Sequence, residues 1–177
     1  EQELERIGSR QGMNNTEFEQ AFEKAAANEK ERVKGIIGQR AAEFEEQLGL
    51  KLYDERIDLI ADQTLQSITD INSVFLDFKE MYHQVMIHNE GLFSQLGVTV
   101  TIADSAIDEI IRVAFEQDRE ISEICTSLAS ELEYGLKLVR DRIGFESFAL
   151  TREAVIDPEK YIDSLIKQYY SHNPATT

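Results

Sequence analysis

The sequence is poor in the residues that interrupt or cross-link a chain. Its 177 residues include two Pro, nine Gly, one Cys and no Trp. So few helix-breaking residues predict long uninterrupted elements, most of them helices. A single cysteine excludes a disulfide framework within the chain and fits a reducing compartment. No apolar run approaches the roughly 20 residues of a membrane span, so we expect a cytoplasmic protein without a membrane partner.

Basic residues are scarce as well. The chain has 18 Lys and Arg against 34 Asp and Glu, which gives a formal net charge of −16. The acidic residues are spread along the sequence, and no basic patch stands out. This charge repels the phosphates of nucleic acids and of anionic membrane surfaces, so we expect no nucleic acid as a partner. The chain begins with Glu1 and not with Met, and we therefore expect it to be part of a longer protein.

The first predicted helix begins with a capping signal. Thr16 and Glu19 have the spacing of a capping box, in which Thr16 is the N-cap residue. Apolar residues then recur at helical spacing as far as Leu48. Gly35 and Gly38 fall inside this stretch, so a break or kink is expected near them.

Two further helices complete the first half of the chain. Gly49 is expected to end the first helical stretch as a C-cap. Helical spacing predicts helices over about 52–68 and from 74 towards 96. Between them, residues 69–73 are rich in side chains that compete for backbone hydrogen bonds, which predicts a turn.

The second half combines strands with helices. In residues 98–102 Val and Ile alternate with Thr, which predicts a short strand. A second strand is predicted within residues 147–156. Between them, Asp104 is expected to cap one helix, and residues 120–142 carry a long apolar stripe typical of another.

These elements define a fold class. Asp157 and Pro158 predict the start of a last helix, with Pro at its first position. We expect the two strands to pair in a small sheet of two or three strands. The predicted fold is therefore mostly α (α+β), with a helical extension over residues 1–69 and a second domain over residues 70–177.

No group of residues points to catalysis. Glu80 and His83 have the Glu-x-x-His spacing of di-iron bundles, but such a site needs a second copy and two further Glu residues. We interpret both as surface residues of an amphipathic helix. Cys125 lies on an apolar stripe, which favours a buried small side chain over a nucleophile. The sequence contains no glycine-rich phosphate loop.

Apolar residues at helical spacing have two interpretations. Leu128 and Leu132 lie mid-stripe on the long helix, four residues apart, and are predicted core anchors. Four aromatic residues are most simply core, and a stripe that binds a partner is the alternative. These are Phe18, Phe22, Phe75 and Phe78.

The segment from Leu92 to Ile111 resembles the start of the C-terminal small domain of Clp/HslU-type AAA+ unfoldase ATPases. In that family a helix ends shortly before Gly-Val, and a short strand, Thr-Asp-x-Ala and a helix with paired apolar residues follow; here the segment includes Gly-Val-Thr-Val-Thr-Ile-Ala-Asp-Ser-Ala. The helix from Ile121 to Val139 and the segment 154–163 are similar to the family's closing helices and strand. The resemblance covers about residues 70–167 and implies an AAA+ small, or lid, domain.

One departure from the family concerns its nucleotide sensor. The family has Gly-Ala-Arg near the start of the long helix, and this Arg reaches the ATP phosphates from the small domain. In this sequence Ile124, Cys125 and Thr126 align with that motif. Thr126 therefore occupies the sensor position, and its side chain carries no positive charge. The resemblance implies that ATP and Mg²⁺ are bound by a large domain absent from these 177 residues. We therefore expect the chain alone not to be catalytic.

Three functions remain open from the sequence. The resemblance implies the C-terminal lid and oligomerisation part of an ATP-dependent protein-remodelling ATPase, a chaperone or unfoldase. Its partners would be neighbouring subunits of a homo-oligomer, with protein substrates or a protease partner for the whole protein. The alternative is an acidic helical protein–protein interaction module with no nucleotide role. The third, a di-iron bundle, depends on Glu80 and His83 alone, and two predicted strands count against it.

Overall fold

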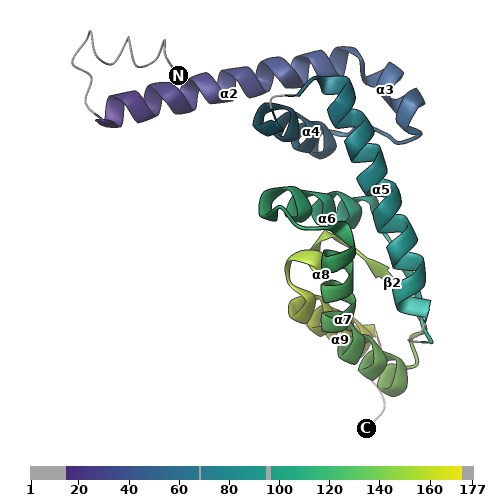
Figure 1. Cartoon of the computed structure of the whole chain (residues 1–177). Helices are drawn as coiled ribbons and strands as arrows, with labels where there is room; N and C mark the ends of the chain where they lie inside the picture. The colour runs from purple at the N-terminus through teal and green to yellow at the C-terminus, as the bar shows by residue number, and fades with distance from the viewer. Residues whose placement is uncertain (1–14, 68, 95–96, 173–177) are drawn as a thin grey trace. The chain divides into compact units, whose positions relative to one another are not determined.

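The chain folds into two compact units. The computed structural model describes residues 15–67, 69–94 and 97–172. The units are Glu1–Phe75 and Leu76–Thr177, whereas the sequence suggested a boundary between residues 69 and 70. Figure 1 shows their elements, and each unit contains its own set of buried apolar side chains. As predicted, the fold is mostly helical with a small sheet.

Helices form the described part of the first unit. They are α2 (Asn15–Gln39), α3 (Ala41–Leu48), α4 (Asp54–Ser67) and the start of α5 (Ile71–Ser94). The break predicted near Gly35 and Gly38 lies at Arg40, and both glycines are inside α2. Gly49 ends α3 with φ 68°, a left-handed conformation that favours glycine, so the predicted C-cap is confirmed.

Two predicted features at helix starts are wrong. Thr16 lies inside α2 and is therefore not its N-cap residue. Helix α5 begins at Ile71, within the predicted turn, because Asp70 caps it. The Asp70 carboxylate accepts hydrogen bonds from the backbone N–H groups of Asn72 (3.0 Å) and Ser73 (3.3 Å), which a helix start otherwise leaves unpaired. The Ser73 hydroxyl also donates to it (2.6 Å), which is the main reason that the pKa of Asp70 is lowered.

Helices α2 and α4 pack against each other through apolar side chains. Val33 and Ile37 of α2 are buried. Ion pairs flank them: Lys30 Nζ lies 2.8 Å from an Asp62 oxygen, and Lys34 Nζ lies 2.8 Å from Asp58 Oδ1. Each of these half-exposed pairs contributes little by itself, so apolar burial provides most of the stabilisation of this interface.

An aromatic stack joins α3 to the start of α5. The rings of Phe44 and Phe75 are stacked, with their centroids 3.7 Å apart and an angle of 14° between their planes. The Arg40 guanidinium carbon lies 4.4 Å from the centroid of the Phe44 ring, within the range of a cation–π interaction. Both phenyl rings are buried, which confirms Phe75 as core.

Arg56 of α4 is buried completely. Its Nη1 donates to the backbone oxygen of Lys51 (2.8 Å), and its guanidinium carbon lies 4.7 Å from the centroid of the Tyr53 ring. A buried cation needs such partners because it has lost its hydration. The segment between α3 and α4 is therefore held in place by hydrogen bonding to a buried charged side chain and not by apolar packing alone.

The second unit contains a two-stranded parallel sheet among its described residues. Thr99 pairs with Ser147 and Ile102 with Leu150. A parallel pair requires a crossover connection, and here two helices provide it. The elements after α5 are β1 (Thr99–Ile102), α6 (Asp104–Gln117), α7 (Ile121–Ile143), β2 (Ser147–Leu150), α8 (Arg152–Ile156) and α9 (Pro158–His172).

Two details of the predicted second half are wrong. The strand expected within 147–156 ends at Leu150, and residues 152–156 form α8. Contacts with α6 explain this helix, because Ala154 is buried there and Arg152 reaches the Glu109 carboxylate. Asp104 is the first residue of α6 and not its N-cap, which is Ala103. Its carboxylate instead accepts a hydrogen bond from the Tyr82 hydroxyl (2.8 Å).

The apolar stripe of α7 is the core of the second unit, as predicted. Leu128 is 6% exposed and Leu132 is fully buried. Helix α7 packs against α6 and α9. Gly135 lies against Ile162 of α9, because a Cβ atom placed at residue 135 would lie 2.6 Å from Cγ1 of Ile162. The absence of a side chain at residue 135 therefore sets how closely these two helices pack.

We expect Gly135→Ala to lower the free energy of unfolding, because overpacking of a core costs about 1–3 kcal/mol. The added Cβ would also lie 2.9 Å from Cγ2 of Ile162, a branched side chain that has few alternative rotamers. Alanine gains roughly 1 kcal/mol over glycine inside a helix, and this gain offsets only part of the cost of three contacts as short as 2.6–2.9 Å. Urea denaturation followed by circular dichroism gives the value. Gly91→Ala in α5 is the matched control, since nothing lies within 4 Å of its added Cβ, and it should stabilise the unit. A stabilised Gly135→Ala would contradict the close packing.

In the described ranges, every helix is too short or too polar to cross a lipid bilayer.

Candidate functional site

Thr126, the predicted sensor position, lies on the exposed side of α7. Its hydroxyl donates to the backbone oxygen of Ser122 (2.7 Å), and its own backbone oxygen accepts from the Ser130 hydroxyl (3.0 Å). These are local bonds within one helix. Thr126 therefore has the exposure that a ligand-contacting residue needs, but its hydroxyl is engaged by the backbone.

We expect Thr126→Arg to change the free energy of unfolding by less than about 0.5 kcal/mol, because the side chain faces solvent. Cys125→Arg is the matched control, with the same new side chain at the adjacent buried position. It should destabilise the unit strongly, because arginine would place an unpaired charge in the core. Thermal melts of both variants measure the difference. If Thr126→Arg unfolds the second unit, the side chain at residue 126 is not directed to solvent.

Cys125 is buried, as predicted. It is 5% exposed, and burial raises the pKa of its thiol to about 11. At neutral pH the thiol is therefore protonated, and a protonated thiol is a poor nucleophile. The side chain acts as a small apolar group of the α7 stripe.

Glu80 and His83 are both exposed on α5. A Glu80 carboxylate oxygen accepts a hydrogen bond from Gln84 (3.3 Å). No group of three or more His, Cys, Asp or Glu side chains that could hold a metal ion occurs within the described residues. Among the residues that the structure describes, no second Glu-x-x-His pair therefore joins Glu80 and His83.

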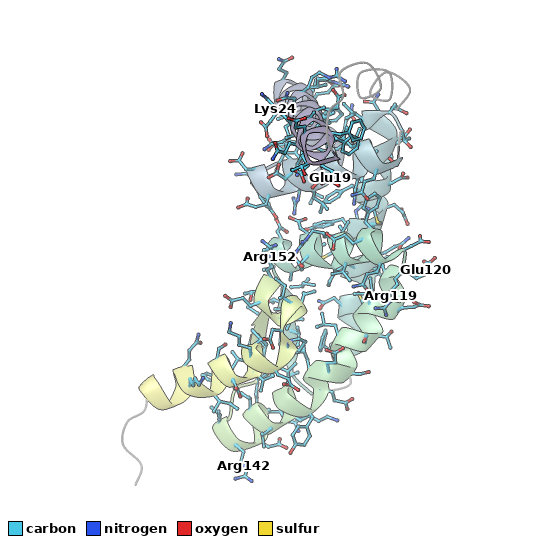
Figure 2. All side chains as sticks on the ribbon, turned by 90° about the vertical axis from the view of Figure 1, so that its left-hand side faces the viewer. Glu19, Lys24, Arg119, Glu120, Arg142 and Arg152 are labelled. Atoms are coloured by element: carbon cyan, nitrogen blue, oxygen red, sulfur yellow. The ribbon has the colours of Figure 1, made fainter. Side chains whose placement is uncertain are left out.

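Glu109 forms an ion cluster in the second unit that the sequence did not reveal. Its carboxylate is buried and accepts hydrogen bonds from Arg112 on the same helix and from Arg152 of α8, whose Nε lies 2.9 Å away. Figure 2 labels Arg152 among the side chains of the chain. The hydrogen bond to Glu109 is the main cause that raises the pKa of Arg112. The carboxylate has two cationic partners, so this cluster fixes α8 on α6 and has no need of a ligand.

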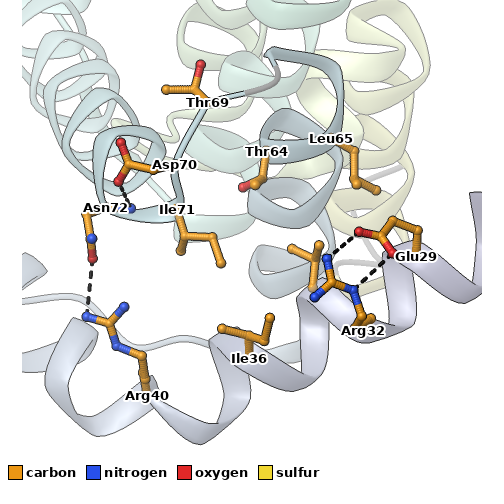
Figure 3. A pocket seen from close by; sticks show the side chains of 11 residues that line it. Glu29, Arg32, Ile36, Arg40, Thr64, Leu65, Thr69, Asp70, Ile71 and Asn72 are labelled. Carbon is orange, nitrogen blue, oxygen red and sulfur yellow. Dashed lines mark hydrogen bonds and ion pairs between the residues drawn. The ribbon is translucent and has the colours of Figure 1, made fainter.

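A hollow of about 540 Å³ lies between α2, the end of α4 and the start of α5 (Figure 3). Val33, Ile36 and Ile71 contribute apolar walls, and Arg32 and Arg40 contribute two cations. Two arginines in a chain this acidic could attract an anion.

Both arginines of this hollow already have carboxylate partners. Arg32 Nε lies 3.0 Å from a Glu29 oxygen, and Arg40 Nε lies 3.0 Å from a Glu43 oxygen. Hydrogen bonding within these pairs raises the pKa of each arginine and lowers that of each glutamate. Arg40 also donates to the Asn72 side chain (3.2 Å). An anion would have to displace these partners, so the geometry does not single out phosphate as a ligand.

A second hollow, of about 560 Å³, lies in the second unit between β2 and α9. Phe145 and Leu165 contribute apolar surface, and Glu153 lies at its lining. The Tyr161 hydroxyl donates to the backbone oxygen of Ala149 (2.9 Å), and burial raises the pKa of Tyr161. Neither hollow could be predicted from the sequence, because each is lined by more than one element.

No family model, curated protein or solved structure matches the chain.

Proposed function

We propose that this chain is the C-terminal lid and oligomerisation part of a Clp/HslU-like AAA+ protein-remodelling ATPase. The observation that supports this most is the order of elements after α5. A strand, two helices, a second strand and two closing helices follow one another, and the two strands pair although two helices separate them. The resemblance of residues 70–167 implies a strand, helices and a closing strand before the last helix, but it places the closing strand from Ala154, where the structure has α8.

In this proposal the chain transmits motion and does not perform chemistry. ATP and Mg²⁺ are bound by a large domain outside these residues, and the lid packs against a neighbouring subunit. The exposure of Thr126 supports the proposal, because the equivalent side chain of the family points towards the nucleotide. Protein substrates or a protease partner would then belong to the whole protein.

The isolated chain is expected not to hydrolyse ATP and to bind Mg-ATP weakly or not at all. Tight phosphate binding requires backbone amide cradles or well-placed cations. The sequence has no glycine-rich loop, and Arg32 and Arg40 are engaged by glutamates. Isothermal titration calorimetry with Mg-ATP tests this directly. A submicromolar dissociation constant for the chain alone would contradict the proposal that a large domain outside these residues binds the nucleotide.

The lid function itself is tested on the full-length gene product. Sedimentation velocity should show an oligomer that a non-hydrolysable ATP analogue stabilises, and deletion of residues 76–177 should abolish it. A full-length product without a phosphate loop, or an oligomer indifferent to that deletion, would contradict the proposal.

The second candidate function is a helical interaction module with no nucleotide role. It is favoured by the first half of α2, where residues 16–28 are exposed apart from Phe18 and Ala21, which are half-buried. Phe22 is 51% exposed, and Phe18 lies one helical turn before it. A partner whose binding requires Phe22 but does not depend on nucleotide would favour this function over the lid.

A further inference from the structure

Glu80 and His83 belong to an exposed row of side chains along α5. Leu76 precedes Glu80 by four residues, and Ile87 follows His83 by four. Residues three and four apart are neighbours on the surface of a helix, so these four side chains lie on one face. All four are exposed and belong to the second unit. We call these four residues the α5 face.

The two ends of the α5 face are apolar. Leu76 is 67% exposed and Ile87 is 70% exposed. A single exposed apolar side chain is common on a protein surface and needs no explanation. Here two of them share one row, and the steps of four, three and four residues are those between the contact positions of a coiled coil. The face therefore has the pattern of a helix–helix contact.

The α5 face is complementary to itself in the antiparallel orientation. When a two-fold axis passes between residues 81 and 82, Leu76 of one copy lies opposite Ile87 of the second copy. Glu80 then lies opposite His83 of the second copy, so a carboxylate meets a hydrogen-bond donor. A parallel pair would place Glu80 opposite Glu80, and like charges across an interface repel each other. The pattern of charge thus indicates a second copy of this chain, in antiparallel orientation, as the occupant.

The same pairing brings together two Glu-x-x-His pairs, which one chain does not do within its described residues. Two carboxylates and two imidazoles form a set of four ligands, the number that Zn²⁺ prefers, and both groups bind divalent transition metals. In metal-binding helix bundles, Glu-x-x-His pairs from two helices project inwards in this way. The Glu80 carboxylate accepts a 3.3 Å hydrogen bond from the Gln84 amide, a neutral partner that a metal cation would displace.

The α5 face is too small to hold two copies together by itself. It extends over about 17 Å of helix, from residue 76 to residue 87. Specific protein interfaces bury roughly 800 Å² on each partner, with about 20–30 residues on each side. A shared metal ion supplies bonds that so small a contact lacks. Pairing through this face should therefore depend on the metal.

We propose that two copies of this chain pair in antiparallel orientation along the α5 face and bind one divalent transition-metal ion between them. The ligands are Glu80 and His83 of each copy, and Leu76 packs against Ile87 at both ends. This inference does not depend on the lid function, because it uses neither a nucleotide nor the sensor position.

Sedimentation equilibrium of the full chain without an affinity tag tests the pairing, once with ZnCl₂ and once with EDTA. Zinc should lower the dissociation constant of the dimer at least tenfold. Atomic absorption after gel filtration should find one zinc ion for every two chains. A dissociation constant that zinc leaves unchanged, or one zinc ion bound by each monomer, overturns the proposal.

Two histidine variants locate the ion. His83→Ala should remove the effect of zinc on the dissociation constant. His88→Ala is the matched control, since it makes the same change on α5 five residues further on, where the side chain points to another side of the helix. It should keep the zinc effect. The melting temperature of His83→Ala in EDTA should equal that of the wild type, because the side chain is exposed. A zinc effect that persists in His83→Ala places the ion elsewhere and overturns the proposal.

Cysteine cross-linking in the presence of zinc tests the orientation. Leu76→Cys and Ile87→Cys, mixed and oxidised with glutathione disulfide, should cross-link to each other and not to themselves. In the antiparallel pair the two copies of residue 76 are about 17 Å apart along the helix, too far for a disulfide. The wild type is the control, because its Cys125 is buried and its pKa of about 11 keeps the thiol protonated. A Leu76→Cys variant that cross-links to itself would indicate a parallel pair and contradict the proposal.

Discussion

Replacing both Leu128 and Leu132 by alanine is expected to abolish the cooperative unfolding transition of the second unit. Both side chains are buried mid-stripe on α7, where this helix packs against α6 and α9. Each truncation of a buried leucine costs about 2–5 kcal/mol, and a domain is stable by only about 5–15 kcal/mol in total. Leu128 and Leu132 are neighbours, so the two losses of stability need not add. Even one of these losses removes a large share of the free energy of unfolding of the unit.

The experiment needs a readout that separates the two units. Hydrogen exchange followed by mass spectrometry reports on each segment, and peptides from α6 and α7 should lose protection while those from α4 keep it. Leu76→Ala is the matched control, because the Leu76 side chain is 67% exposed. It should leave the exchange pattern unchanged. A double variant that retains protection in α6 and α7 would mean that the stripe is not the core of this unit.

The α7 stripe was predictable because helix periodicity alone determines it. A residue repeated every three or four positions lies on one face wherever the helix packs, so Leu128, Leu132 and Cys125 were placed correctly from spacing. The same holds for Gly49, whose left-handed conformation, with φ of 68°, is a local property of a helix end. Signals of this kind can be predicted because they do not depend on tertiary contacts.

Tertiary contacts decided the features that spacing missed. Val155 and Ile156 favour a strand by propensity, but the burial of Ala154 against α6 and the pairing of Arg152 with Glu109 make this segment helical. Propensity is a weak preference that such contacts readily override.

Burial of Arg56 was likewise hidden, because a charged residue in a sequence is expected at the surface. Its backbone acceptor at Lys51 becomes visible only once the segment before α4 is folded. Both hollows depend in the same way on segments that meet only in the folded unit, such as β2 and α9. A pattern along one helix cannot reveal a space between several elements. The hollow between β2 and α9 therefore could not be predicted, although a strand from residue 147 and a last helix from Pro158 were.

We expect Phe44→Ala to lower the free energy of unfolding of the first unit by about 3–5 kcal/mol. The Phe44 ring is fully buried and stacked on Phe75, so alanine leaves a cavity and removes the ring contact together. The Arg40 guanidinium would also lose the ring beneath it, since its central carbon lies 4.4 Å from the Phe44 centroid. Guanidinium chloride denaturation of the full chain, followed by hydrogen exchange of the α2 and α4 peptides, measures the loss.

Phe22→Ala makes the same chemical change at a ring that is 51% exposed in the same unit. It should alter the free energy of unfolding by less than about 0.5 kcal/mol, because the ring leaves little buried space behind. Phe44→Leu separates the contribution of the filled apolar volume from that of the stacked ring. It keeps most of the apolar volume and loses the stacked ring, so a loss near 1 kcal/mol is expected, within the range measured for aromatic pairs. Equal losses for Phe22→Ala and Phe44→Ala would mean that the stack between α3 and α5 does not hold the first unit together.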